Sequence, residues 1–302
     1  MTRRLATVLV FALALVQLGA APAGADDLSR IRDQGKIRLG HRAEARPFSY
    51  LDESGKPAGY SVALCEKIVD ALKTELGLTQ LPIEWVKVDS DDRFEAVESG
   101  SIDLLCGAAT ATLERRKKVA FSIPIFPSGI SALVRVDAPA RFRELLEGRT
   151  PPYRPTWRAS MAQILDKRVL SAEKGTTAAD WLVKRRAELQ VNAEIAEVAN
   201  YQEGVQRVLM RSSDAFFADR AILVEKIAQS SSAADLVILD RQFTYEPIAL
   251  VSARGDEDLR LAVDRTLSGL YRSGQIWEIY RRYFGDLDEN VKTFFRMAAL
   301  PE

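Results

Sequence analysis

One arginine in a basic run of the sequence stands where its side chain could bind an anion. Arg115 follows Thr110 by five residues, and both come after the apolar run 102–106 and a glycine. A guanidinium group is planar and can pair with a carboxylate through two parallel hydrogen bonds. Arg115 is therefore a candidate carboxylate ligand. The alternative is a solvated helix face shared with the basic residues 116–118, and residue chemistry by itself favours that alternative.

Other reactive side chains are few. His41 is the only histidine and has no serine or cysteine nucleophile motif beside it, so we expect a structural role at a strand end. The sequence has no Cys-x-x-Cys pair and no cluster of metal-ligand residues, and we expect neither a metal nor a cofactor. Cys65 and Cys106 can form a disulfide in an oxidising compartment or stay as two buried thiols, and the sequence leaves both open.

The N-terminus predicts export. Arg3 and Arg4 precede an almost wholly apolar stretch over residues 5–18, and the letters AGA at 23–25 supply a cleavage site. This is the pattern of a secretory signal peptide over residues 1–25. An uncleaved anchor is the alternative, but the apolar stretch is shorter than the roughly 20 residues that a spanning helix needs. We expect a soluble mature protein in the periplasm.

Charge argues against a nucleic-acid partner. The whole chain has 42 basic and 42 acidic residues. Removal of residues 1–25 takes away Arg3 and Arg4, which leaves two more acids than bases. Nucleic-acid-binding domains usually carry a basic excess instead.

Strand and helix patterns alternate along the mature chain, which is typical of an α/β fold with parallel sheets. Strands are expected at 36–41, 82–88, 101–106, 129–136, 167–172, 194–199, 214–217 and 247–252. Helices are expected at 61–76, 91–99, 177–189, 203–211, 221–228 and 258–284, with a break at Ser273-Gly274, and another helix is expected to start within 106–122. A hairpin is expected at 49–60, and the segment 138–166 mixes a helical RFRELLEG with a proline-rich stretch.

The strand and helix patterns divide into two units of about 100 residues each, which predicts two lobes with a cleft between them. In open α/β sheets, ligands bind beyond the carboxyl ends of strands, and anions bind at helix N-termini. Residues 107–112 and 175–177 are expected to be such places, one in each unit. A small anion is therefore expected between the lobes.

Eight segments, taken in order, resemble the extracellular solute-binding proteins of family 3, the polar amino-acid capture components of ABC importers. The segments are GHR (40–42), PFSY (47–50), GKPAGYSVALCEKIVDAL (55–72), DRFEAVESGSIDLLCG (92–107), TLERRKKVAFS (112–122), GTT (175–177), FFAD (216–219) and YRSGQIWEIYRRYFG (271–285). Within the family, the GHR segment, the Ser90 and Arg93 pair and the CG-x-x-T-x-x-x-x-R pattern look most like the glutamate/aspartate-binding proteins.

The resemblance implies a two-lobe periplasmic binding protein fold of type II, with two hinge strands and a ligand cleft between the lobes. Lobe 1 would comprise residues 26–128 plus 247–302, and lobe 2 residues 129–246. An insert near 141–165 has no counterpart in compact members of the family.

The resemblance also implies a set of ligand-binding residues. Arg115 and Thr110 would bind the α-carboxylate of an amino acid, with Thr176 contributing from the other lobe. Asp219 would pair with the α-ammonium, helped by a backbone carbonyl near Ala108. For Asp219 the alternative is a helix N-cap.

Selection of the ligand side chain would fall to Arg42, Ser90 and Arg93, which in acidic amino-acid binders surround the distal carboxylate. Two buried cations are costly without a partner anion, and a distal carboxylate would supply one. The alternative for Arg93 is a surface ion pair with Asp91 or Glu95. The full candidate set is Arg42, Ser90, Arg93, Ala108, Thr110, Arg115, Thr176, Tyr201 and Asp219.

Two site positions depart from the resemblance. A serine frequent in the family is replaced by Ala108, which removes one hydroxyl. A histidine of close relatives aligns near Tyr201, and tyrosine cannot become cationic at neutral pH. The choice among glutamate, aspartate and a related dicarboxylic amino acid or amide stays open.

The predicted function is capture of an amino acid, glutamate or aspartate, and its delivery to an inner-membrane ABC permease by hinge closure, without chemistry on the ligand and with the protein as a monomer. One alternative is a secreted enzyme similar to cyclohexadienyl dehydratase, for which Glu173 is the candidate proton donor. Another is an accessory protein that senses its ligand.

Overall fold

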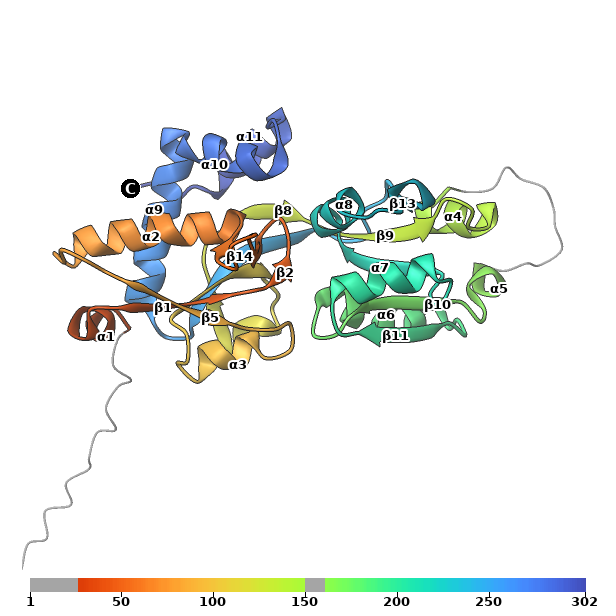
Figure 1. The fold of residues 1–302 in the computed structure, drawn as a ribbon, viewed down its shortest axis with the longest axis horizontal. Coiled ribbons are helices and arrows are strands. Elements are labelled where there is room, and N and C mark those ends of the chain that lie inside the picture. The colour runs from red at the N-terminus through yellow and green to blue at the C-terminus, as the bar shows by residue number, and fades with distance from the viewer. Residues whose placement is uncertain (1–26, 150–160) are drawn as a thin grey trace, which may run out of the picture.

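The computed structural model describes residues 27–149 and 161–302 (Figure 1). The predicted signal peptide, residues 1–25, lies outside the described residues, as do positions 150–160 of the predicted insert. The described chain forms two lobes side by side, each with its own main sheet and flanking helices. The α/β class is confirmed. Within the described ranges, no helix is long and apolar enough to cross a membrane.

Lobe 1 is built on a six-stranded sheet with the order β5-β1-β6-β14-β7, in which β8 also pairs with β14. Its strands are β1 (Ile37–His41), β5 (Ile83–Lys87), β6 (Leu104–Thr110), β7 (Val119–Phe121), β8 (Phe126–Ser128) and β14 (Glu246–Ala253). The first three are parallel, whereas β14 is antiparallel to its three neighbours. The predicted hairpin is part of a small antiparallel sheet of β2 (Glu44–Ala45), β3 (Ser49–Leu51) and β4 (Pro57–Ala58).

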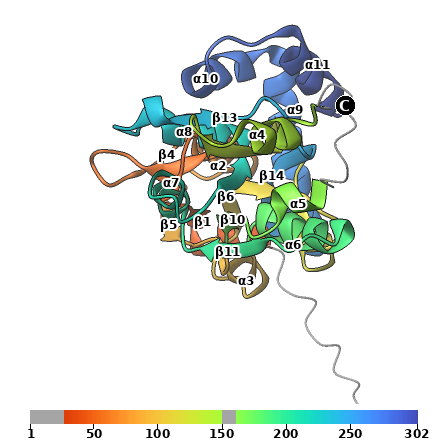
Figure 2. The ribbon, with the colours of Figure 1, turned by 90° about the vertical axis from the view of Figure 1, so that its right-hand side faces the viewer.

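Six helices of the described chain flank the lobe 1 sheet: α1 (Asp27–Gln34), α2 (Tyr60–Glu75), α3 (Arg93–Glu98), α9 (Glu257–Ser273), α10 (Gln275–Phe284) and α11 (Glu289–Ala298). Helix α3 lies on the side of the lobe opposite α10 and α11 (Figure 2). The predicted break at Ser273-Gly274 separates α9 from α10. Helix α11 is an addition to the predicted helices, and it is held by Phe295, which is fully buried against Tyr271 and Trp277.

Lobe 2 contains a five-stranded sheet with the order β11-β10-β12-β9-β13. Its strands are β9 (Ile130–Arg135), β10 (Val169–Glu173), β11 (Glu194–Val198), β12 (Ala215–Asp219) and β13 (Leu236–Ile238). Its helices are α4 (Ala140–Glu147), α5 (Met161–Leu165), α6 (Thr177–Leu189), α7 (Tyr201–Leu209) and α8 (Arg220–Ala228). Strands β10 and β12 are parallel, so their last residues, Glu173 and Asp219, lie at the same edge of the sheet. That edge faces lobe 1.

Two strand segments cross between the lobes and lie against each other. The chain leaves the lobe 1 sheet at Ser128 and enters the lobe 2 sheet at Ile130, and it returns to lobe 1 through β14. A Cβ atom on Gly129 would lie 2.2 Å from the carbonyl oxygen of Thr244, so only glycine permits this approach. The lobe limits proposed at 128 and 246 fall at these two crossings.

The helix predicted to start within 106–122 is wrong. Strand β6 instead runs to Thr110 and pairs with β14, where Thr110 is opposite Ile248. Only a 3-10 turn over Arg115–Lys117 follows before β7 begins at Val119. Pairing with the long buried strand β14 therefore outweighs the local helical preference of the charged residues. The segment 107–112 is consequently not a helix N-terminus, whereas 175–177 does begin α6.

The two cysteines form a disulfide. Cys65 of α2 is bonded to Cys106 of β6, and both are fully buried. Of the two states left open by the sequence, the bonded one is present. The bond ties helix α2 to the strand that ends at Thr110.

Candidate functional site

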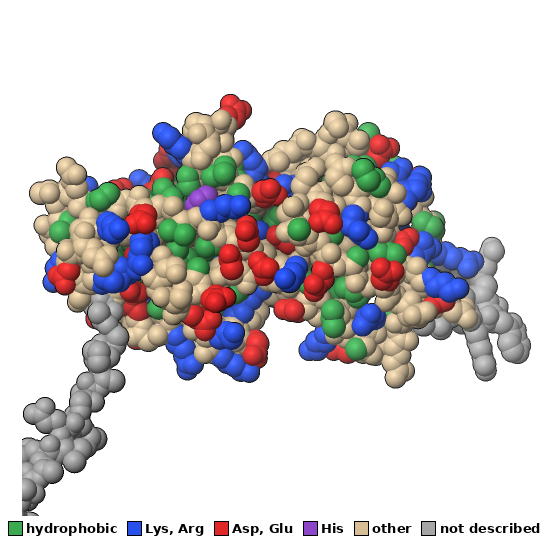
Figure 3. All heavy atoms as spheres, turned by 60° about the horizontal axis from the view of Figure 1, so that its bottom comes forward, with side chains coloured by type: hydrophobic (Ala, Val, Ile, Leu, Met, Phe, Trp, Pro, Cys, Tyr) green, Lys and Arg blue, Asp and Glu red, His purple; other side chains and the backbone are tan. Residues whose placement is uncertain are grey.

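The turn between β10 and α6 places lobe 2 directly against lobe 1. Five residues of this turn, Glu173 to Thr177, lie at the junction, and four of them bond to the other lobe or to the returning strand β14. Acidic and basic side chains both stand along the junction in the space-filling view (Figure 3). The lobes are therefore in contact across the cleft, in a closed arrangement.

Arg42 and Ser90, two of the predicted side-chain selectors, share one partner from lobe 2. Arg42 donates from Nη2 to Glu173 Oε1 at 2.8 Å, and Ser90 donates from Oγ to the same oxygen at 2.7 Å. The Arg42 and Glu173 side chains are 6% and 1% exposed. Burial would by itself lower the pKa of Arg42, but nearby Tyr201 and Glu173 outweigh it and raise the pKa.

Arg93, the third predicted selector, is 3% exposed and bonds to backbone only. It donates to the carbonyl of Ser90 and, at 3.2 Å, to the carbonyl of Gly175. Among the described residues, no carboxylate lies within ion-pair distance of it, so the predicted alternative of a surface pair with Asp91 or Glu95 is absent there. Burial, then the positive charges of Arg115 and Arg42, lower the pKa of Arg93 to about 9.

Arg115 turns back from the 3-10 turn toward the junction. It donates from Nη1 to the carbonyl oxygen of Thr110 at 3.0 Å and from Nη2 to the carbonyl oxygen of Gly175 at 3.3 Å. Its guanidinium lies 4.8 Å from the ring centre of Phe94, and the guanidinium of Arg93 lies 4.6 Å from the same ring centre. Burial lowers the pKa of Arg115, although Asp180 and Glu246 act against this. Residues 116–118 are exposed, whereas Arg115 is half-buried, so the surroundings of Arg115 differ from those of its basic neighbours.

Asp219 sits at the N-cap position of α8 but makes no capping hydrogen bond with its side chain. Its Oδ1 instead accepts a hydrogen bond of 2.6 Å from the hydroxyl of Ser128 in β8. Burial raises the pKa of Asp219 to about 6, and the charge of Glu246 adds to this, while Ser128 and Arg115 act against it. A carboxylate that is costly to ionise here would be stabilised by a ligand cation.

The two threonines of the predicted anion site behave differently. Thr176 is the N-cap of α6 and accepts from Ala179 N, while its hydroxyl also donates to the carbonyl oxygen of Glu173 at 2.6 Å. Thr110, which is 4% exposed, donates at 3.0 Å to Oε2 of Glu246.

Glu246 is a junction residue that sequence reasoning missed. Besides Thr110 of lobe 1, its Oε2 accepts from Thr177 of lobe 2 at 2.5 Å, and its Oε1 accepts from Thr244 at 3.0 Å. No motif marks this position, because Thr110 and Thr177 are far from it in the sequence and Thr177 reaches it only across the junction between the lobes. A glutamate at the start of a returning hinge strand is the one signal that the sequence offers.

The remaining candidates line the same region. Tyr201, at the start of α7, is buried, and burial and then Glu173 raise its pKa well above the ordinary value. Ala108 lies in β6 next to Gly107, whose carbonyl oxygen accepts from Ser61 at 3.0 Å. The described residues contain no group of three or more metal-ligand side chains placed to hold a metal ion.

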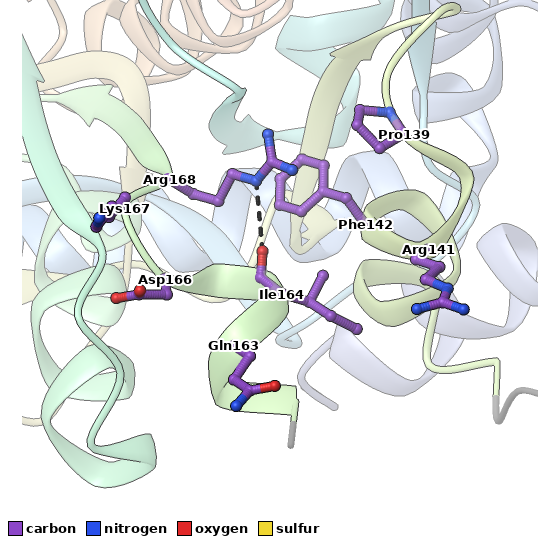
Figure 4. A pocket seen from close by; sticks show the side chains of 8 residues that line it. All are labelled: Pro139, Arg141, Phe142, Gln163, Ile164, Asp166, Lys167 and Arg168. Carbon is purple, nitrogen blue, oxygen red and sulfur yellow. Dashed lines mark hydrogen bonds between the residues drawn. The ribbon is translucent and has the colours of Figure 1, made fainter. Parts of the chain in front are cut away.

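A surface hollow lies elsewhere, beside α4 and α5 of the insert region. It has a volume of about 440 Å³ and is lined by Pro139, Arg141, Phe142, Gln163, Ile164, Asp166, Lys167 and Arg168 (Figure 4). Arg168 donates from Nε to the carbonyl oxygen of Ile164 at 3.3 Å and lies over the ring of Phe142. None of the predicted ligand-binding residues lines it, so the hollow is separate from the cleft.

Residues 37–286 match the sequence pattern of the bacterial extracellular solute-binding proteins, family 3. The chain belongs to this family. The match covers both lobes and both crossing strands, so the family resemblance expected from short motifs is confirmed.

Relatives of the family 3 protein include amino-acid-binding proteins. It is 30% identical over 286 residues to the L-glutamate/L-aspartate-binding protein of Pseudomonas aeruginosa, with 93% of this chain and 88% of the relative covered. It is 26% identical to the glutamate/aspartate import solute-binding protein of Escherichia coli, with 88% and 82% covered.

A solved structure with the same fold is the ancestral amino acid-binding protein AncCDT-1, a precursor of cyclohexadienyl dehydratase. It aligns with a TM-score of 0.68 and 24% identity over 86% of this chain and 100% of its own. The two-lobe type II binding-protein fold is thereby confirmed. The chain is an amino-acid solute-binding protein of family 3.

Proposed function

We propose that this protein captures an amino acid of the glutamate and aspartate class, meaning the two dicarboxylic amino acids and their amides, outside the cytoplasm and delivers it to an ABC transporter permease. The observation that carries the proposal is the convergence of two buried arginines, Arg42 and Arg93, with the half-buried Arg115 and Asp219 at one closed junction. The relatives named as glutamate/aspartate-binding proteins support this class of ligand.

The α-amino-acid end of the ligand is assigned to Arg115 and Asp219. Arg115 presents a guanidinium fork beside Thr110, and its present partners are two backbone carbonyls, which a carboxylate would replace with a stronger, charge-assisted pair. Asp219 supplies the negative charge for the α-ammonium. Thr176 at the start of α6 adds amide donors of a helix N-terminus from lobe 2.

The mechanism is a hinge whose equilibrium the ligand shifts. In the open state the cleft admits the ligand, which binds lobe 1 through Arg115 and Thr110. Closure about the Ser128–Ile130 crossing and strand β14 then brings Asp219 and Thr176 onto it. A ligand favours closure only through contacts that the open state lacks, and the lobe 2 residues provide these contacts.

Cellular placement and partners are part of the same proposal. The signal-like residues 1–25 support export to the periplasm, and the family is described as extracellular. An importer role implies that the closed form docks on a permease as a monomer. A sensing role shares the same binding step, and co-purification with a permease rather than a receptor separates the two.

An enzymatic role has less support. A dehydratase needs an acid that donates a proton to a leaving hydroxyl. Glu173 Oε1 is instead the acceptor of two hydrogen bonds, from Arg42 and Ser90. The relatives are named as binding proteins. Incubation with prephenate is expected to give no product, and formation of product would replace capture by catalysis.

Calorimetry on protein that has been unfolded and refolded, to remove carried ligand, tests the proposed function. Glutamate, aspartate, glutamine, asparagine, lysine and leucine make a suitable panel. At least one of the first four is expected to bind in the micromolar range or tighter. Binding of lysine or leucine alone would exclude the proposed ligand class.

A further inference from the structure

Glu173 is hydrogen-bonded to residues that the family resemblance assigned to the distal carboxylate of the ligand. Its Oε1 lies 2.8 Å from Arg42 Nη2 and 2.7 Å from Ser90 Oγ, across the junction between the lobes. Two of the three groups expected to hold a distal carboxylate are thus already bonded to a carboxylate of the protein. The cation of Arg42 has its counter-ion before any ligand enters, so the cost of burying it no longer calls for an acidic ligand.

Two polar atoms at this junction have no hydrogen-bond partner among the described residues, and one is an acceptor and the other a donor. Glu173 Oε2 is a buried acceptor without a hydrogen-bond partner, and Arg93 Nε is a buried donor without one. Their side chains converge at Ser90, which donates to Glu173 through its hydroxyl and accepts from Arg93 through its carbonyl. Buried polar atoms without partners are costly, so a ligand that satisfies both is favoured.

A carboxamide matches this pair of groups. Its oxygen can accept from Arg93, and its NH₂ can donate to Glu173 Oε2. A carboxylate can accept from Arg93, but it would face Glu173 with a second negative charge and no donor. A carboxamide and a carboxylate have nearly equal size and shape and differ only in the NH₂ group that replaces one oxygen. Contact of that group with Glu173 Oε2 would therefore distinguish the two side chains.

The other charged and polar neighbours of Glu173 do not reverse this preference. Tyr201 can donate or accept a hydrogen bond, so it suits either side chain. Lys226, which is 8% exposed, is the further cation near Glu173, and it also lies near Glu44. Because Lys226 lies near two carboxylates, Glu44 and Glu173, it does not by itself favour a further carboxylate in the ligand.

We propose that Glu173 is a specificity-determining residue, which makes the side-chain pocket prefer a carboxamide, as in glutamine or asparagine, over the matching dicarboxylic amino acid. The inference rests on the proposed function, because it assumes that the ligand belongs to the glutamate and aspartate class. It adds a preference for the amides over the acids within that class and assigns this preference to Glu173.

The test measures the dissociation constants of glutamate and glutamine, and of aspartate and asparagine, for the wild-type protein and for Glu173→Gln. The wild type is expected to bind the amide of the better pair more tightly. In Glu173→Gln the side chain offers an NH₂ donor in place of the charged acceptor, so the ratio of acid to amide dissociation constants should fall at least tenfold. Glu173→Ser, with circular dichroism as a check of folding, gives the same comparison if Glu173→Gln is unstable.

Lys174→Gln is the matched control. It removes a second ion pair across the junction, Lys174 with Asp91 at 3.2 Å, which is solvent-exposed and does not involve Arg42, Ser90 or Arg93. A role of Glu173 in closure alone would change all affinities together in both variants. We expect Lys174→Gln to leave the acid to amide ratio unchanged.

Two results would overturn the inference: a ratio in Glu173→Gln within twofold of the wild type, or a wild-type protein that binds the acid more tightly than the amide. Failure of all four amino acids to bind the wild type would instead reject the proposed function. The two failures are thus distinguished in the same set of titrations.

Discussion

The hydroxyl of Ser128, in the strand that crosses out of lobe 1, donates a 2.6 Å hydrogen bond to the carboxylate of Asp219 in lobe 2. Asp219, the proposed partner of the ligand's α-ammonium, is therefore hydrogen-bonded to a strand of the hinge. Changes in the charge of Asp219 act at the point about which the lobes move.

Ligand affinity should fall as the pH drops below about 6. Burial raises the pKa of Asp219 to about 6, so its ionised form, which the ligand ammonium needs, is lost below that pH. Between pH 5 and 7 the carboxylates and the ammonium of free glutamate or glutamine keep most of their charge. Titrations across this range should show the dissociation constant rising toward pH 5. In Asp219→Asn, binding should be weak and nearly independent of pH, and a pH dependence equal to the wild type would contradict the assignment.

The same raised pKa has the opposite effect on stability of the ligand-free protein. The folded state holds the Asp219 proton more tightly than the unfolded state, so this group stabilises most below its ordinary pKa. That contribution is lost as the pH rises through about 6. Thermal unfolding of wild type and Asp219→Asn, each without ligand, should therefore diverge on going from pH 4 to pH 7, with the variant the more stable at pH 7. Parallel curves would show that burial of this carboxylate has no cost.

Arg115→Ala should weaken binding of every amino-acid ligand, by about 2–4 kcal/mol, because a buried charge-assisted pair to the α-carboxylate is lost. Arg116→Ala is the control, since Arg116 is the exposed neighbour in the same turn. Calorimetry with each ligand measures the effect. A similar loss in both variants would mean that the run acts through its overall charge.

Arg93→Ala should act on the side chain of the ligand. It is expected to weaken glutamate and glutamine, whose terminal oxygen it would contact, and to spare alanine, which has no terminal oxygen. Competition binding against a fluorescent probe gives the three affinities on one scale. Equal losses for all three would show that Arg93 supports the fold of the cleft rather than recognition.

Gly129→Ala should destabilise the protein, by about 1–3 kcal/mol, because the added methyl group would overlap the Thr244 carbonyl in the other crossing strand. Gly269→Ala is the matched control, since nothing lies within 4 Å of a Cβ at that position within α9. Alanine is the better helix former by about 0.5–1 kcal/mol, so the control should be slightly more stable than the wild type. Chemical denaturation gives both differences, and a neutral Gly129→Ala would show that the crossing strands can separate at no cost.

Local patterns were sufficient to predict the fold class, most of the strands and helices, and the place of Thr176 at the start of α6. Each of these depends on periodicity or on a cap within a few residues. The helix within 106–122 was wrong because β6 pairs with a strand about 140 residues later in the chain. Such pairing leaves no mark in the local sequence.

The site divides in the same way. Arg42, Ser90 and Arg93 do come together, as the family resemblance implied. Their pairing with Glu173 could not be predicted, since it joins residues 131 and 83 positions apart that meet only across the closed junction. Glu246, with partners in both lobes, was missed for the same reason.

Gly175 sets how far the cleft can shut. Its carbonyl oxygen accepts hydrogen bonds from the side chains of both Arg93 and Arg115. A Cβ atom at this position would lie 2.8 Å from the carbonyl oxygen of Ser90. A single methyl group would therefore act as a steric stop between the lobes and hold them slightly apart. The absence of a side chain at this one position is therefore what allows the two lobes to approach each other this closely.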